Sequence, residues 1–167
     1  MDIEPLNEVN IRAIVESDGG NGWKHDPTVW TECQRKADAG ERVTLVAMQD
    51  DKALGYGSLV WRSAYKRFAA SDIPEIHDVA TAKRFRRMGV AKTIIASLEE
   101  IAAKRGRLHV GIGVGLYADY GSAQRLYASL GYAPDGFGAT YRGSPVEPGA
   151  QYSVDDDFIL WLTKALV

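Results

Sequence analysis

Cysteine and long apolar runs are both scarce in this chain. Cys33 is the only cysteine among 167 residues, which excludes an intramolecular disulfide and a paired-cysteine zinc or redox site. Such usage is typical of a reducing compartment. No stretch approaches the ~18 apolar residues of a membrane span, and the first ten residues lack the basic start and apolar run of a secretory leader. We therefore expect a cytoplasmic protein with no membrane partner.

An excess of charge of either sign is also lacking. The chain has 20 Lys and Arg against 22 Asp and Glu, which gives a formal charge of −2. Without a positive field over the whole molecule, a nucleic-acid partner is not expected, and any anion site must be local. Internal repeats and long polar linkers are absent from the sequence. The composition, 46% hydrophobic, predicts a single globular domain over residues 1–167.

Hydrophobic periodicity predicts alternating helices and strands. Helices are expected at 7–17, 27–39, 89–106 and 120–132, and strands at 43–49, 54–61, 73–81, 108–116, 139–142 and 158–166. Asp26 and Pro27 form a cap and first-position pair for the second helix. The first two and the last two strands are expected to form hairpins, whereas the passage 73–116 requires a parallel pair. This order predicts an α/β protein with a mixed sheet.

The strand expected at 108–116 has glycine at most positions of one face. Gly111, Gly113 and Gly115 alternate with apolar residues that begin at Leu108. A face without side chains lets a helix or a ligand lie close to the backbone. The residues alone leave both interpretations open.

The segment 83–92, KRFRRMGVAK, concentrates positive charge at the start of a predicted helix. It holds five cations and no acid, although the whole chain is slightly negative. Because the helix dipole is already positive at that end, such a cluster favours a bound anion, and Gly89 and Ala91 keep side chains away from the free backbone N–H groups. A pyrophosphate fits this description. The alternative is a solvated basic loop.

Two familiar phosphate motifs do not match this segment. A Walker loop needs glycines where the chain has Ala91 and Arg86, and a dinucleotide fingerprint needs three glycines where only Gly89 is present.

The segment does resemble another motif. Arg86 to Ala91, RRMGVA, is similar to the Arg/Gln-x-x-Gly-x-Gly/Ala acetyl-CoA motif of the GNAT N-acetyltransferases, and Ala123–Tyr127 with Leu130–Tyr132 is similar to their Ala-x-x-Leu-Tyr and Leu-Gly-Tyr pattern. The resemblance covers roughly residues 43–142. It implies the GNAT acyl-CoA N-acyltransferase fold, a mixed central sheet of about six or seven strands with about four helices. The sheet would splay between its fourth and fifth strands to admit the pantetheine arm.

The resemblance also implies how acetyl-CoA would be held. The pyrophosphate contacts fall on the backbone N–H groups of Arg86, Arg87, Met88, Gly89, Val90, Ala91 and Lys92. The pantetheine contacts fall on the main chain of Val79, Ala80 and Thr81. Tyr127 matches the tyrosine that protonates the leaving thiolate in many members. Tyr120 stands where an asparagine is common, so one pantetheine contact is expected to be missing or replaced.

Amine acetylation needs a base as well, because an ammonium with a pKa of about 10.4 cannot attack a thioester. Glu75, eleven residues before Arg86, stands where the resemblance implies a catalytic glutamate on the fourth strand and is the first candidate. His77 on the same face is the second, because its ordinary pKa suits a base at neutral pH. Asp78 would join them only if a bulge turned it. Ordered water is the alternative to a side-chain base.

The predicted activity is acetyl transfer from acetyl-CoA to a primary amine, on a small molecule or a peptide amino terminus, by direct attack in a ternary complex. The alternative is a non-catalytic acyl-CoA-binding module or sensor. The resemblance is also compatible with a homodimer. Expected acceptor-pocket residues are the aromatic set Trp23, His25, Trp30, Trp61 and Tyr65 and the acids Asp18, Asp26, Asp155, Asp156 and Asp157.

Overall fold

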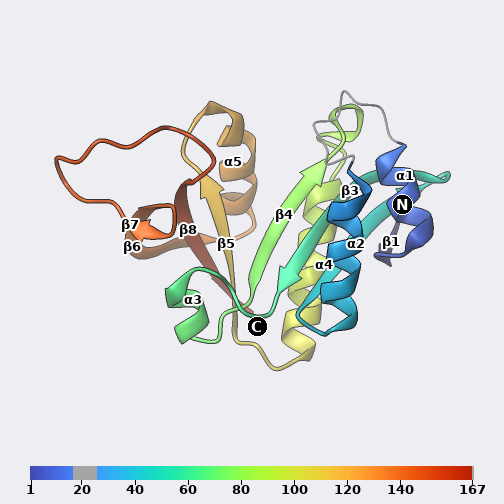
Figure 1. Cartoon of the computed structure of the whole chain (residues 1–167), viewed down its shortest axis with the longest axis horizontal. Coiled ribbons are helices and arrows are strands. Elements are labelled where there is room, and N and C mark those ends of the chain that lie inside the picture. Colours follow the sequence, from blue (N-terminus) through green and yellow to red (C-terminus); the bar gives the residue numbers. More distant parts are fainter. Residues whose placement is uncertain (17–25, 167) are drawn as a thin grey trace. The chain divides into compact units, whose positions relative to one another are not determined.

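The computed structural model describes residues 1–16 and 26–166, and its contacts divide the chain into two compact units (Figure 1). The first unit comprises Met1–Trp61 with Ile76–Ile101, and the second comprises Arg62–Glu75 with Ala102–Val167. Each unit combines strands with helices, so the fold belongs to the mixed α/β class.

Within the described residues, four strands and three helices make up most of the first unit. The strands lie in the order β1 (Asp2–Pro5), β2 (Arg42–Gln49), β3 (Lys52–Val60) and β4 (Glu75–Thr81). The helices are α1 (Glu8–Val15), α2 (Pro27–Asp38) and α4 (Val90–Lys104). β2 pairs antiparallel with β1 and with β3. The β2–β3 turn has positive φ at both Asp50 and Asp51, a conformation that Asp tolerates better than most residues.

Helices cover both faces of the strands in the first unit. A Cβ added to Gly55 of β3 would lie 2.8 Å from Cγ1 of Val90, so this face packs closely on α4. Tyr56 points to the opposite face, where its ring centroid is 4.8 Å from that of Trp30 on α2. Figure 1 shows α2 on the near side of these strands and α4 on the far side. Because successive residues of a strand point to opposite faces, β3 places glycine against α4 and an aromatic ring against α2.

Local capping fixes where α1 and α2 begin. Asn7 accepts the N–H of Asn10 at 3.0 Å, and Asn10 Oδ1 in turn accepts the N–H of Asn7 at 2.8 Å. Asp26 accepts the N–H of Thr28 at 2.9 Å, with Pro27 at the first helical position. The predicted cap of the second helix is confirmed.

The second unit contains the other α-helices and strands of the described residues. They are α3 (Lys66–Ala70), β5 (His109–Gly115), α5 (Gly121–Ser129), β6 (Ala133–Tyr141), β7 (Ser144–Pro145) and β8 (Phe158–Ala165). The strands lie in the order β5-β8-β6-β7, and each neighbouring pair for which register is defined is antiparallel. The predicted closing hairpin is confirmed by the pairing of β6 with β8.

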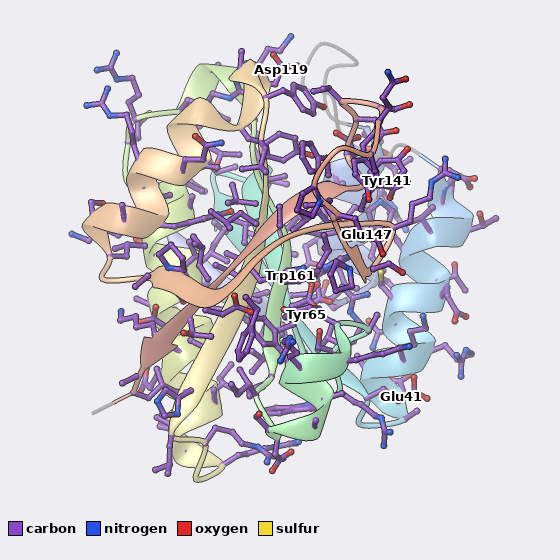
Figure 2. The ribbon with its side chains drawn as sticks, turned by 90° about the vertical axis from the view of Figure 1, so that its left-hand side faces the viewer. Glu41, Tyr65, Asp119, Tyr141, Glu147 and Trp161 are labelled. Carbon is purple, nitrogen blue, oxygen red and sulfur yellow. The ribbon has the colours of Figure 1, made fainter. Side chains whose placement is uncertain are left out.

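Aromatic side chains fill the glycine face of β5. A Cβ on Gly111 would clash with the ring of Phe68 from α3, and one on Gly113 would lie 2.9 Å from the ring of Trp161 on β8. Tyr65, just before α3, stacks on Trp161 with ring centroids 4.3 Å apart and planes 2° apart, and the two are labelled in Figure 2. The helix-packing interpretation of this face is therefore confirmed at Gly111.

Most predicted elements are present, with three additions. Periodicity missed β1, α3 and β7, which are short and lack a full period of apolar residues. Residues 1–16 and 26–166 contain eight strands and five α-helices, where about six or seven strands and about four helices were expected. Leu108, assigned to the apolar face of its strand, is 73% exposed because β5 begins only at His109.

Candidate functional site

A sharply bent turn connects β4 to α4. Ala82 is buried and anchors it, since its N–H donates to the Leu54 carbonyl at 2.9 Å. A short 3-10 helix (Lys83–Phe85) follows, and then Arg87 and Gly89 take φ of +64° and +83°. The left-handed conformation at Gly89 favours glycine and turns the chain into α4.

The start of α4 presents backbone donors among positive side chains. Its first turn contains no acidic residue, and the four segment residues from Arg86 to Gly89 are exposed. The first N–H groups of any α-helix have no intrahelical acceptor, and the dipole makes this end positive. Thr93 reinforces the turn, because its N–H and hydroxyl both donate to the Gly89 carbonyl, at 2.9 and 3.1 Å. The arrangement suits a polyanion.

At the end of β4 the side chains pack into the unit, so the main chain carries the polar groups that a ligand could contact. Val79 Cγ2 would lie 3.3 Å from a Cβ on Gly57, which places Val79 on the α4 face. Ala80 packs with the cluster formed by α1 and α2. Asp78 has φ of +54°, so the strand is irregular at this position. His77 is half exposed, with Nε2 3.6 Å from Asp78 Oδ2.

Glu75 is a buried carboxylate with a defined partner. It is 6% exposed and accepts a hydrogen bond from the Ser63 hydroxyl at 2.5 Å. Ser63 Oγ also accepts the N–H of Tyr65 at 3.0 Å. Glu75 thus supports the segment that leads into α3, a contact that the sequence did not predict.

Tyr127 lies on α5 with its side chain almost entirely enclosed. It is 7% exposed, and burial raises the pKa of its phenol to about 12. The hydroxyl is therefore protonated at neutral pH, the form that can donate a proton or hydrogen bond. Its ring centroid lies 6.1 Å from that of Tyr132, the last residue of the Leu-Gly-Tyr motif.

The predicted aromatic acceptor residues have packing roles where they are described. Trp30 and Tyr65 are buried in separate apolar clusters. For Trp61, the backbone N–H donates to the Glu41 carbonyl at 3.1 Å. Trp23, His25 and Asp18 lie outside the described residues. Asp26 caps α2, and the hydrogen bonds from Thr28 lower its pKa. An acceptor wall of exposed aromatic rings does not form from Trp30 and Tyr65.

The acidic run after β7 is held by neighbouring side chains. Tyr117 and Tyr120 both donate to the same oxygen of Asp156, the latter at 2.9 Å, and these bonds lower the pKa of that carboxyl. Asp155 accepts from Tyr141 at 2.9 Å, and Asp157 lies 3.4 Å from Arg142. Tyr120, which replaces the common asparagine, therefore contacts Asp156.

The sequence of this chain matches a known protein family. The sequence model described as "Acetyltransferase (GNAT) family" matches residues 11–132. The chain belongs to the GNAT acetyltransferase family. It is accordingly an N-acetyltransferase that uses acetyl-CoA as acetyl donor, as the motif resemblance implied. No curated protein sequence matches the chain.

Solved structures share the GNAT fold along almost the whole chain. A protein assigned to the GNAT acetyltransferases from Desulfovibrio desulfuricans superimposes with a TM-score of 0.73 at 12% identity and 99% coverage of each chain. A ribosomal-protein-alanine N-acetyltransferase from Brucella melitensis gives 0.70 at 20% identity, covering 99% of this chain and 100% of its own. An aminoglycoside 6'-N-acetyltransferase complexed with coenzyme A gives 0.66 at 14% identity, covering 100% and 98%.

A groove in the first unit of this GNAT protein was missed by sequence reasoning. It has a volume of about 360 Å³ and is lined by Thr28, Val29, Glu32, Cys33, Lys36, Arg42 and Asp78. These residues come from α2, β2 and β4, so no single motif reveals them. Arg42 is the first residue of β2, and neither its spacing nor its neighbours distinguish it from a surface strand residue.

The described ranges contain neither a metal-binding cluster nor a helix that could cross a membrane. Within residues 1–16 and 26–166, no group of three or more His, Cys, Asp or Glu side chains could hold a metal ion. No helix among those residues has the length and apolarity that a membrane crossing requires.

Proposed function

We propose that this GNAT enzyme transfers the acetyl group of acetyl-CoA to a primary amine, on a small molecule or a peptide amino terminus, by direct attack in a ternary complex. The observation that carries the proposal is the turn from Arg86 to Val90. Its left-handed Gly89 and the open first turn of α4 bring backbone donors together among cations. A pyrophosphate matches this site in charge and in its need for several N–H donors.

Contacts to acetyl-CoA divide between two segments of the first unit. The N–H groups from Arg86 to Lys92 bind the pyrophosphate, and the main chain of Val79, Ala80 and Thr81 binds the pantetheine. The side chains of Val79 and Ala80 pack into the unit, so their main-chain N–H and C=O groups are the polar groups that can contact the pantetheine. This packing supports the assignment of the pantetheine contacts. We keep the prediction that residues 1–167 function as one N-acetyltransferase domain.

The transfer step forms one bond and breaks one. The amine nitrogen, after losing a proton to a base, attacks the thioester carbonyl carbon; the new C–N bond forms, the C–S bond breaks, and the thiolate takes a proton. Tyr127 is the donor we assign to the thiolate, because a phenol is protonated at neutral pH and can donate a hydrogen bond to the charge that develops on sulfur. Glu75 and His77 remain the candidate bases, and only His77 is substantially open to solvent.

The solved neighbours indicate the range of amines that this fold serves. One is named for alanine of a ribosomal protein and another for the 6' position of an aminoglycoside. A peptide amino terminus and a small-molecule amine are therefore both reasonable acceptor classes for the same fold.

Thermal denaturation with acetyl-CoA tests the proposal directly, with dephospho-CoA, ATP and NAD as comparators. A ligand at about a hundred times its Kd adds roughly 2.7 kcal/mol, which raises the Tm of a chain of this size by several degrees. We expect only the CoA species to stabilise the protein. Stabilisation by none of them would refute the acetyl-CoA site. Stabilisation without release of free CoA thiol from any amine panel would instead favour an acyl-CoA sensor.

A further inference from the structure

Arg42 stands out among the side chains of the first unit, because it is a partly buried cation that lacks a carboxylate partner in the described part of the chain. One terminal nitrogen donates to the Ser58 hydroxyl, and Ser58 Oγ lies 2.9 Å from Thr44 Oγ1. The Arg42 Nε is buried with no acceptor among the described residues. A buried, unsatisfied donor on a charged group costs free energy, so the guanidinium is under-compensated, and an anion that reaches its terminal N–H groups from the groove would be bound favourably.

Strand geometry aims this guanidinium at the groove. Arg42 and Thr44 are two residues apart on β2, and Thr44 pairs with Ser58 on β3. Residues two apart share a face, and Thr44 is in turn two residues from Val46, opposite Tyr56. All of them therefore lie on the face covered by α2, where the groove is. Ser58 holds the guanidinium in place and acts as its positioning residue.

Two other charged side chains of the groove, Glu32 and Lys36, already have ion-pair partners. Glu32 binds Arg35 at 2.8 Å and lies 3.7 Å from Lys36, and its pKa is lowered to about 2 chiefly by the bond from Arg35. Asp78, on β4, contacts His77. Arg42 is thus the one groove cation without a carboxylate contact among the described residues. A planar guanidinium favours a carboxylate or a phosphate, which it can bind through two N–H donors.

The balance of charge favours a carboxylate over a phosphate. The lining carries two cations, Lys36 and Arg42, and two anions, Glu32 and Asp78. A zwitterion with one carboxylate and one ammonium matches such a lining, whereas a doubly charged phosphate would face both acids. The volume, about 360 Å³, suits a small molecule. Asp78 also directly precedes Val79, so the amine end of a ligand in the groove lies next to the strand to which we assign the thioester arm.

We infer that this groove is the acceptor subsite for an amino acid or a similarly small amine that carries a carboxylate, and that Arg42 binds the carboxylate. The inference rests on the proposed acetyl transfer, because it names the acceptor class for that reaction. It makes Arg42 a specificity-determining residue with no part in the chemical step.

Matched acceptor pairs test this inference. Common L-amino acids are assayed against their carboxamides, with phosphoethanolamine as the phosphate probe, by release of free CoA thiol. We expect kcat/KM to be about tenfold or more higher for the acids, mainly through KM. Arg42→Gln should remove that preference by raising KM for the acids, and Arg42→Lys should keep only part of the preference. Arg12→Gln, an exposed arginine of α1, is the matched control and should retain the preference.

The two proposals fail in different ways. If acetyl-CoA does not stabilise the wild-type protein, both acetyl transfer and this inference are refuted. Acetyl-CoA binding with acids and carboxamides used equally, or with phosphoethanolamine preferred, would overturn the inference and leave acetyl transfer intact. Retention of the acid preference in a folded Arg42→Gln variant would also overturn it.

Discussion

Gly89 meets two demands at the residue scale: a left-handed backbone and an unobstructed approach to the start of α4. Its φ is +83°, and an added Cβ would meet nothing within 4 Å. Gly106, at the other end of α4, has φ of +74° and equally open surroundings. The two glycines therefore carry the same backbone requirement, but only Gly89 lies in the turn to which we assign acetyl-CoA binding.

Replacing each glycine by glutamate separates strain from ligand binding. Both Gly89→Glu and Gly106→Glu should lose about 1–2 kcal/mol of unfolding free energy, the cost of a left-handed L-residue. Gly89→Glu should also abolish acetyl-CoA binding, because it adds a negative charge where the pyrophosphate binds. Titration calorimetry with acetyl-CoA measures this. Equal affinity in the two variants would place the anion site elsewhere.

Tyr127→Phe tests the proposed thiolate proton donor. General acid catalysis is commonly worth about 10²-fold or more, so kcat should fall by about that factor while the Kd of acetyl-CoA is unchanged. Turnover assays give kcat, and calorimetry on the same preparation gives the Kd of acetyl-CoA. Tyr132→Phe alters the neighbouring ring and should keep kcat close to wild type. A Tyr127→Phe enzyme of normal kcat would remove this hydroxyl from the mechanism.

Elements with strong local signals were predicted well from the sequence. The apolar stripe of α4 repeats over four turns, Asp26 and Pro27 mark the start of α2, and each was found as expected. The motif and the charge of residues 83–92 likewise indicated an anion site at the start of α4, and that assignment stays a prediction. Short elements such as α3 carry too few residues for a period, and the groove at Arg42 depends on three segments that only folding brings together.

The β5 glycine face shows how one element depends on another. Gly111 accepts the ring of Phe68 from α3, so Gly111→Ala overpacks this contact and should cost about 1–3 kcal/mol in urea unfolding. Phe68→Leu makes room, and in that background the cost of Gly111→Ala should be smaller. Simple additivity of the two changes would contradict direct packing between this helix and strand.

At the scale of the whole molecule, enclosed tyrosines couple stability to high pH. Burial, with a hydrogen bond to Asp135 for Tyr65, raises the pKa of both Tyr127 and Tyr65 to about 12, and burial also raises the pKa of Tyr120. In the unfolded chain each phenol titrates near its ordinary value of about 10. The folded state therefore holds these protons more tightly, and the resulting stabilisation is complete below pH 10.

That stabilisation should be lost as the pH rises from 10 through 12, because the unfolded chain then gains charge that the folded chain resists. For Tyr127, the difference between a pKa of about 10 in the unfolded chain and about 12 in the folded chain corresponds to about 3 kcal/mol. Urea unfolding of wild type and Tyr127→Phe should give parallel pH profiles between pH 7 and 9. Above pH 10 the wild-type free energy of unfolding should fall more steeply than that of the variant, since phenylalanine has no proton to lose. Profiles that stay parallel up to pH 11.5 would contradict this prediction. They would show that the Tyr127 hydroxyl reaches solvent in the folded protein and that its pKa is not raised there.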